Sequence, residues 1–283
     1  MSEIAGSNIV ITGGASGIGR LIAKKLAALG GYVVIWDVNQ GNLDKVVSEI
    51  NAMTRQPALG FVCDVSRREE VYRVAEQVKV AAGPVDILIN NAGIVSGKQL
   101  LDIPDEKIVM TFAINTLALF WTAKAFLPQM IKRNRGHIVN VASASALVGV
   151  AQLSDYAASK WATMGFDESL RAELKQVSPG VRTTVVCPYY INTGMFKGVK
   201  SRVPWLLPIL EADYVAERVV TAIRRNQPRV MMPTILYLLP PMRFLPVVVF
   251  DWIADFLGIN VAMSAFTGRQ GEPDKAVQRT QGA

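Results

Sequence analysis

A glycine-rich turn near the start of the chain constrains the fold more than any other stretch. The apolar run at residues 9–11 is typical of a buried strand, and a helical pattern begins at Leu21. Between them stand Gly13, Gly17 and Gly19. Glycines let the backbone approach a phosphate, and a helix N-terminus offers free N–H groups with a partial positive charge. The stretch predicts a dinucleotide site, with a plain tight turn as the alternative because the spacing is not G-x-G-x-x-G.

An acid after the next apolar run indicates which dinucleotide binds. Residues 32–36 are typical of a second buried strand, and Asp37 follows it, where the adenosine ribose hydroxyls are expected. A carboxylate accepts hydrogen bonds from both hydroxyls and repels a 2′-phosphate, and neither Ser16 nor Val38 supplies a cation for that phosphate. We therefore predict NAD rather than NADP. The alternative for Asp37 is a solvated acid at a strand end.

The composition supports a globular α/β chain and argues against several other classes. Of 283 residues, 51% are hydrophobic and 19% charged, enough to build a sizeable core. Two cysteines without a C-x-x-C motif and a single histidine argue against a disulfide framework or a metal site. The chain starts without a basic region and a long apolar core, so we expect no signal peptide, no secretion and a cytoplasmic location.

Positive charge is concentrated in one part of the sequence. The net charge is +7, and residues 197–243 hold eight basic and three acidic side chains among long apolar runs. This interleaving is unlike a nucleic-acid-binding domain, so no nucleic acid is expected. An anionic membrane surface is the better partner.

Strand signals alternate with helical patterns, which predicts one Rossmann-type, doubly wound parallel sheet with helices on both faces. The six strand signals are residues 9–11, 32–36, 58–62, 85–89, 137–142 and 181–187. We assign residues 1–229 to a dinucleotide-binding and catalytic domain, 230–270 to an apolar C-terminal extension and 271–283 to a polar tail.

Ligands of such sheets gather at the carboxyl ends of the strands. Asp64 follows the third strand and either accepts from an adenine amino group or caps the helix that begins near Ser66. After the fourth strand, residues 91–93 permit close approach to a ribose and nicotinamide, whereas Asn90 is expected to tie strand ends together. His137 begins the fifth strand, at the opposite edge, and is predicted to be a surface residue.

Four polar residues are candidates for chemistry. Tyr156 and Lys160 are spaced i and i+4, so they share one helix face, and the cation is expected to lower the tyrosine pKa. Ser143 stands just beyond the fifth strand. Asn115 lies inside a long apolar helix over residues 111–130, where it holds either a water or a helix break. The alternatives are an incidental Tyr–Lys pair, a polar strand end and a core asparagine with satisfied hydrogen bonds.

The C-terminal third contains apolar clusters that are interrupted by prolines. None of these runs reaches the ~20 residues that a membrane-spanning helix needs. Arginines such as Arg225 and Arg243 among Trp and Leu favour a helix lying in a membrane interface. The alternatives are a cover over a lipophilic pocket or a contact with a second subunit.

Together these residues resemble the classical short-chain dehydrogenase/reductases. The resemblance rests on the glycine turn from Thr12 to Gly19, on residues 90–93 and on Ser143 with the Tyr156–Lys160 pair. Residues 187–196 and the apolar tail are similar to the branch that contains epidermal-type retinol dehydrogenases and lipid-droplet 17β-hydroxysteroid dehydrogenases. The chain differs from those animal enzymes at Tyr189, where many members have glycine, and we expect no N-terminal membrane anchor.

The resemblance implies a role for each site residue. Tyr156 is the acid/base, Lys160 lowers its pKa and holds the nicotinamide ribose, Ser143 binds the substrate oxygen, and Asn115 holds a water of a proton relay. Ser143, Tyr156 and Tyr189 are expected to contact substrate, and residues 189–211 are expected to form a lid over it. The expected cofactor contacts are Gly13, Ser16, Gly17, Ile18, Gly19, Asp37, Asp64, Val65, Asn91, Ala92, Gly93, Tyr156, Lys160, Pro188, Ile191 and Thr193.

We therefore predict an NAD-dependent oxidoreductase that interconverts a lipophilic alcohol and its carbonyl, of retinoid, steroid or long-chain type. It would act as a homodimer, with peripheral contact to a membrane or lipid droplet. One alternative is an oxidoreductase of small polar carbonyls whose extension is an oligomer contact. Another is a non-catalytic, NAD-sensing protein of lipid surfaces.

Overall fold

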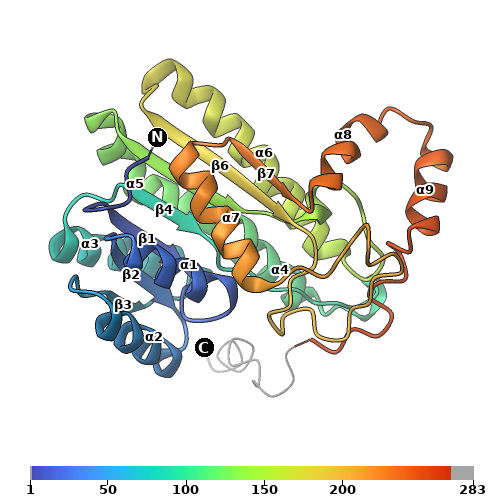
Figure 1. The fold of residues 1–283 in the computed structure, drawn as a ribbon, viewed down its shortest axis with the longest axis horizontal. Helices are drawn as coiled ribbons and strands as arrows, with labels where there is room; N and C mark the ends of the chain where they lie inside the picture. Colours follow the sequence, from blue (N-terminus) through green and yellow to red (C-terminus); the bar gives the residue numbers. More distant parts are fainter. Residues whose placement is uncertain (1, 269–283) are drawn as a thin grey trace.

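A computed structural model describes residues 2–268, and its centre is a seven-stranded sheet (Figure 1). Every strand pair is parallel, and the strand order is β3-β2-β1-β4-β5-β6-β7. The strands are β1 (Asn8–Thr12), β2 (Tyr32–Asp37), β3 (Leu59–Val62), β4 (Ile87–Asn90), β5 (Gly136–Val141), β6 (Val181–Pro188) and β7 (Arg229–Met232).

Helices cover both faces of this sheet, as the alternating pattern predicts. They are α1 (Gly17–Ala28), α2 (Gln40–Met53), α3 (Arg68–Ala82), α4 (Asp105–Phe112), α5 (Ala118–Arg133), α6 (Ser154–Val177), α7 (Ala212–Arg225), α8 (Leu239–Met242) and α9 (Val247–Phe256). Apolar side chains of α1, α2 and α7 pack on one face, and those of α3, α5 and α6 pack on the other. The doubly wound fold is therefore confirmed.

The strand order reverses between β1 and β4. The chain first builds outward from β1 to β3, then crosses back to place β4 on the other side of β1. Such a reversal separates the loops that follow the two strands and opens a crevice at their carboxyl ends. This position holds the candidate site.

The sequence pattern missed the seventh strand. Residues 229–232 pair with β6 in the sheet, although most of them fall in the stretch that we assigned to the apolar extension. The strand has only four residues and runs on into further apolar residues. Its sequence therefore shows no clear alternation of apolar and polar side chains. Its partner strand, not its own sequence, distinguishes it from the segment that follows.

The remainder of the extension forms a projection beyond the carboxyl end of β7 (Figure 1). It contains α8 and α9 and then residues 259–268, which return to the loop after β6: the Thr267 N–H donates to the Lys197 carbonyl at 2.9 Å. The tail predicted at residues 271–283 lies outside the described residues.

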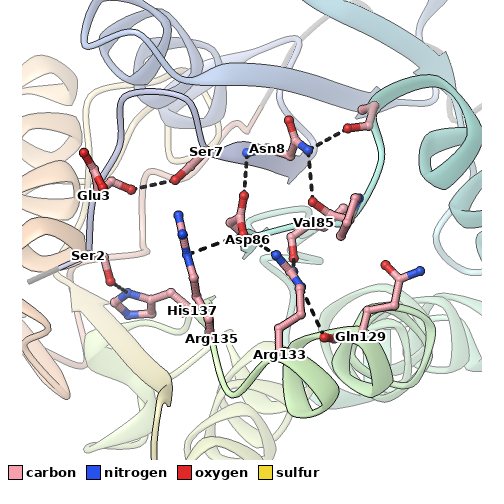
Figure 2. A network of polar contacts seen from close by, with 12 residues as sticks. Ser2, Glu3, Ser7, Asn8, Val85, Asp86, Gln129, Arg133, Arg135 and His137 are labelled. Carbon is pink, nitrogen blue, oxygen red and sulfur yellow. Dashed lines mark hydrogen bonds and ion pairs between the residues drawn. The ribbon is translucent and has the colours of Figure 1, made fainter.

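The prediction that His137 is a surface residue is wrong. Its side chain is buried, Nδ1 lies 3.0 Å from Ser2 Oγ, and Nε2 lies 2.8 Å from Thr184 Oγ1. It sits at the amino ends of the strands, beside a polar network in which Asp86 binds Arg133 and the Asn8 backbone (Figure 2). The N-terminal residues fold over this edge and bury the imidazole, which the local sequence does not reveal.

Burial of His137 predicts a specific loss of stability in acid. Desolvation lowers the pKa of His137 to about 4 from an ordinary value of 6.5. The unfolded chain therefore takes up a proton first, and stability that is present above pH 6.5 is lost as pH falls toward 4. His137→Gln has no imidazole and does not lose this stability. The difference in the free energy of unfolding, variant minus wild type, should therefore be ~2–3 kcal/mol larger at pH 4 than at pH 7. Urea titrations at both pH values measure it, and a constant difference would contradict it.

Within residues 2–268, one stretch is long and apolar enough to cross a membrane by length and composition, residues 105–133. In the fold it is a helix of the protein body, since α5 packs against α3 and α4 packs against α6. This packing buries part of its apolar surface, whereas Val109, Leu117 and Phe120 stay partly exposed.

Candidate active site

A cavity of about 1850 Å³ runs along the carboxyl ends of the strands. At one end it is lined by the glycine turn and by residues after β2 and β3, and at the other by apolar side chains of the extension. Every expected site residue except Gly19 and Asn115 lines it, including Ser143, Tyr156 and Lys160. Asn115 lies just behind its wall.

The glycine turn is held tightly against the loop after β4. Asn91 donates from Nδ2 to the carbonyls of Thr12 (3.0 Å) and Gly13 (2.9 Å). A Cβ on Gly13 would lie 2.9 Å from the Ala92 Cα, and one on Gly19 would lie 2.3 Å from the Gly13 carbonyl oxygen. Side chains at these two positions would push the loops apart, and α1 would no longer present its N-terminus to the cavity.

Asp37 ends β2 and borders this end of the cavity. Its carboxylate accepts hydrogen bonds from the N–H groups of Ala15 (3.0 Å) and Asn39 (3.1 Å), so its direction is fixed. Arg20, the cation nearest in sequence, is engaged by Glu49 in a bidentate ion pair. The residues therefore fit an adenosine end with free ribose hydroxyls.

Asp64 closes a turn rather than capping a helix. Its Oδ1 accepts from the Ser66 N–H at 3.0 Å and the Ser66 hydroxyl at 2.6 Å, whereas α3 begins later, at Arg68. The cap interpretation is therefore wrong. Asp64 and Val65 both line the cavity, which is where the adenine interpretation requires them.

Asn115 lies at a break in the long helix, and its side chain is also buried and hydrogen-bonded, so the helix-break and core-asparagine interpretations both fit. Residues Ala113–Leu117 form a π-helical turn between α4 and α5. The Asn115 side chain accepts from the Ile94 N–H (2.9 Å) and donates to the Ile94 carbonyl (3.0 Å) and to Ser159 Oγ (3.0 Å). It therefore ties the loop after β4 to α6. A Cβ on Gly93 would lie 3.3 Å from Asn115 Oδ1 and 3.5 Å from Lys160 Nζ.

Tyr156 and Lys160 share one face of α6, and β5 presents Ser143 to them. The Tyr156 hydroxyl is hydrogen-bonded to the Ser143 side chain. The ammonium of Lys160 lies 5.6 Å from the Tyr156 ring centroid and donates to the Val141 carbonyl at 2.8 Å. The Ser145 N–H donates to Ser143 Oγ at 3.1 Å and orients that hydroxyl. The three side chains thus converge on one point of the cavity.

Burial dominates the protonation of this group. Desolvation raises the pKa of Tyr156 to about 12, although the Ser143 hydrogen bond opposes the rise, and it lowers the pKa of Lys160 to about 8. This differs from the expected lowering of the tyrosine pKa. The reason is that burial removes the water that stabilises the phenolate, and this loss of stabilisation is larger than the stabilisation by nearby hydrogen-bond donors.

Comparisons with known proteins agree with this geometry. A sequence model of the short chain dehydrogenase family matches residues 7–204. Epidermal retinol dehydrogenase 2 of Homo sapiens is 47% identical over 273 residues, which cover 95% of this chain and 87% of that protein. The chain belongs to the short-chain dehydrogenase family. It is an oxidoreductase that acts on CH–OH donors, and its sequence is retinol dehydrogenase-like.

Solved structures of the family extend the comparison to the cofactor. A short-chain dehydrogenase/reductase from Burkholderia phymatum in complex with NAD has a TM-score of 0.77, with 28% identity over 85% of this chain and 94% of that chain. A metagenomic short-chain oxidoreductase in complex with NADP has a TM-score of 0.68, with 31% identity over 81% of this chain and 96% of that chain. Similar folds therefore bind either nicotinamide dinucleotide.

The wall of the short-chain dehydrogenase cavity beyond Tyr156 is apolar and comes largely from the C-terminal extension. Its lining there includes Leu206, Leu207, Leu236, Leu239, Met242, Phe250, Ile253, Ala254, Leu257 and Phe266. Residues of the extension therefore line the cavity, as the pocket-cover alternative requires. Pro188, Tyr189, Ile191 and Thr193, which follow β6 or end it, also line the cavity.

Two pocket residues were missed by sequence reasoning. Tyr190 and Ser145 both line the cavity, and each has a buried hydroxyl without a hydrogen-bond partner among the described residues. Ser145 lies two residues after Ser143, and Tyr190 directly follows Tyr189, so their positions could have marked both as candidates. Nothing in the sequence, however, shows which hydroxyls are engaged elsewhere.

Proposed function

We propose that this short-chain dehydrogenase interconverts a lipophilic alcohol and its carbonyl with NAD as the cofactor and Tyr156 as the acid/base. The observation that carries the proposal is the convergence of Tyr156, Ser143 and Lys160 at the border between a polar dinucleotide cleft and an apolar pocket wall. A retinoid, a steroid or a long-chain alcohol matches that wall. Retinol dehydrogenases among the relatives support the same class.

The protein's part in the chemistry is to move one proton while the cofactor takes or gives a hydride. When bound, the nicotinamide accepts a hydride from the alcohol carbon or returns it. Tyr156 removes the alcohol proton in oxidation and donates it in reduction. Ser143 donates a hydrogen bond to the substrate oxygen, and Lys160 favours the phenolate. Asn115 keeps the backbone after β4 beside Lys160, where a water can link the ammonium to solvent.

The preference for NAD rests on Asp37, and it gives a test. In Asp37→Asn the shape is kept while the charge that repels a 2′-phosphate is removed. We expect the ratio of kcat/KM for NADP to that for NAD to rise about tenfold, which corresponds to about 1.4 kcal/mol. Asp44→Asn, an exposed acid on α2, is the matched control. An unchanged ratio in the Asp37 variant would remove this residue from cofactor selection.

We further propose that the projection with α8 and α9 lies in a membrane interface. Phe244, Val248 and Trp252 expose 93%, 80% and 67% of their surface, far more than a solvated helix normally shows. Arg243 stacks on the rings of Trp161 and Phe250 beside them and can meet anionic headgroups. The opposite face of α9 lines the pocket through Phe250 and Ala254.

A triple variant, Phe244→Ser with Val248→Ser and Trp252→Ser, tests this surface. Each side chain contributes roughly 1.5–3 kcal/mol when fully buried in lipid, so we expect at least about a tenfold loss of binding to phosphatidylcholine vesicles that contain phosphatidylserine. Val80→Ser is the control, because Val80 is 89% exposed and lies on α3, on the opposite side of the molecule from α8 and α9 (Figure 1). Co-sedimentation that is equal for both variants would contradict the proposal.

The homodimer stays part of the proposal. Three apolar side chains are partly exposed and provide a surface for a second copy: Leu117 in the π-helical turn, Phe120 on α5 and Trp161 on α6. Sedimentation equilibrium of the purified chain determines whether it associates.

Activity assays separate this function from its alternatives. The purified protein with NAD is tested on retinol, hydroxysteroids, long-chain secondary alcohols and small polar alcohols, with NADH formation as the readout. Turnover of the lipophilic members supports the proposal. Turnover of the polar members alone would favour the small-carbonyl alternative, and NAD binding without any turnover would favour the non-catalytic one.

A further inference from the structure

Two adjacent tyrosines follow β6, and the environments of their hydroxyls differ. The Tyr189 side chain is only partly buried, and its hydroxyl lies near the Ser201 side chain. The Tyr190 side chain is buried, with 8% of its surface exposed, and its hydroxyl has no hydrogen-bond partner among residues 2–268. Leaving a buried hydroxyl unpaired is costly, so a protein that keeps one in a ligand cavity has it available for a ligand.

The position of Tyr190 is fixed by the backbone on both sides. Its carbonyl accepts from the Leu210 N–H at 2.8 Å, and the Asn192 N–H donates to the Leu210 carbonyl at 2.9 Å. Ile191 and Leu210 form an isolated parallel bridge. The phenol is therefore presented by a braced segment, which suits a group that must meet a ligand at a set distance.

Tyr190 stands beside the catalytic tyrosine. Both rings pack edge-on against Phe196, with centroid distances of 5.1 Å for Tyr190 and 5.8 Å for Tyr156. Burial and the neighbouring tyrosines Tyr189 and Tyr156 raise the pKa of Tyr190. Its hydroxyl consequently stays protonated when Tyr156 ionises, and it can both donate and accept a hydrogen bond.

We propose that Tyr190 is a specificity-determining residue whose hydroxyl hydrogen-bonds a second oxygen of the substrate. The preferred substrates are then lipophilic alcohols or ketones that carry a further hydroxyl or carbonyl oxygen near the reacting carbon. This inference rests on the proposed function. It narrows the substrate class, because a purely hydrocarbon substrate would leave the Tyr190 hydroxyl buried and unpaired.

The test compares one alcohol with and without the second oxygen. Decan-2-ol and the hydroxydecanones that carry a keto group at successive positions along the same chain are assayed with wild type and Tyr190→Phe. Wild type is expected to prefer at least one hydroxydecanone about tenfold in kcat/KM, and Tyr190→Phe to lose that preference while its activity on decan-2-ol stays within about twofold of wild type. Tyr214→Phe on α7 is the control for an exposed tyrosine.

The midpoint of thermal unfolding provides a second readout. If Tyr190 had a purely structural role, its replacement would lower this midpoint. Tyr190→Phe removes an unpaired buried hydroxyl, so its unfolding midpoint should equal or exceed that of wild type. A lowered midpoint in Tyr190→Phe, together with equal activity losses on all substrates, would show that Tyr190 is a packing residue and overturn the inference.

Failure of the inference can be told apart from failure of the proposed function. If wild type oxidises decan-2-ol and the hydroxydecanones equally, the function stands and the role of Tyr190 is wrong. If wild type oxidises none of them, calorimetric binding of decanediones to the NAD complex tests Tyr190 directly. A dissociation constant about tenfold weaker in Tyr190→Phe supports the inference, and an equal constant overturns it.

Discussion

Tyr156→Phe is expected to lower kcat/KM for alcohol oxidation by about 10³-fold, within the range of a lost general acid/base. The ring of Tyr156 packs on Phe196, and phenylalanine keeps that contact. What disappears is the hydroxyl that Ser143 binds and that faces the cavity. The loss should appear in kcat and in kcat/KM alike, because the proton transfer contributes mainly to the transition state.

The measurement needs a check that only the chemistry has changed. NADH binding, followed by fluorescence titration, should stay within about twofold of wild type, since the expected cofactor contacts are otherwise intact. Tyr237→Phe, which alters a hydroxyl bound to the Arg229 carbonyl, serves as the matched substitution away from the site. If Tyr156→Phe kept a tenth or more of wild-type activity, another group would be the acid/base.

Lys160→Met is expected to lower oxidation by about 10²-fold at pH 7, and the deficit should shrink at higher pH. Methionine keeps the chain length but removes the ammonium that favours the phenolate of Tyr156. Burial lowers the pKa of Lys160 to about 8, so wild type loses its own positive charge as pH rises through that value. The ratio of wild-type to variant activity should therefore be largest below pH 8 and fall above it.

A pH series of kcat/KM for both proteins measures this ratio. Lys175→Met is the matched control, because Lys175 lies on the same helix with its side chain exposed. A ratio that stays constant from pH 6 to pH 10 would mean that Lys160 acts by binding alone. Equal activity of variant and wild type would remove it from the mechanism.

Local patterns anticipated most of the fold because they report on short-range chemistry. The glycine turn, the buried runs and the helical spacing of Tyr156 and Lys160 each depend on residues close in the chain. The prediction for His137 was wrong because its burial comes from N-terminal residues such as Ser2, far away in sequence. The strand at residues 229–232 was missed because only pairing with β6 distinguishes it from the apolar segment after it.

The features of the site also divide into those that the sequence indicates and those that only the fold decides. The sequence nominates Asn115, Ser143, Tyr156 and Lys160 as the candidate groups for proton transfer and substrate binding, and Asp37 as the candidate for cofactor selection. Three features were decided by the tertiary structure alone: the engagement of Arg20 by Glu49, the π-turn that ties Asn115 to Ile94, and the difference between the Tyr189 and Tyr190 hydroxyls. The sequence determines which side chains are present and which of them share one face of a helix or strand. Burial and the pairing of polar groups depend on contacts between distant segments, and these set the pKa values and leave particular hydroxyls available for a substrate.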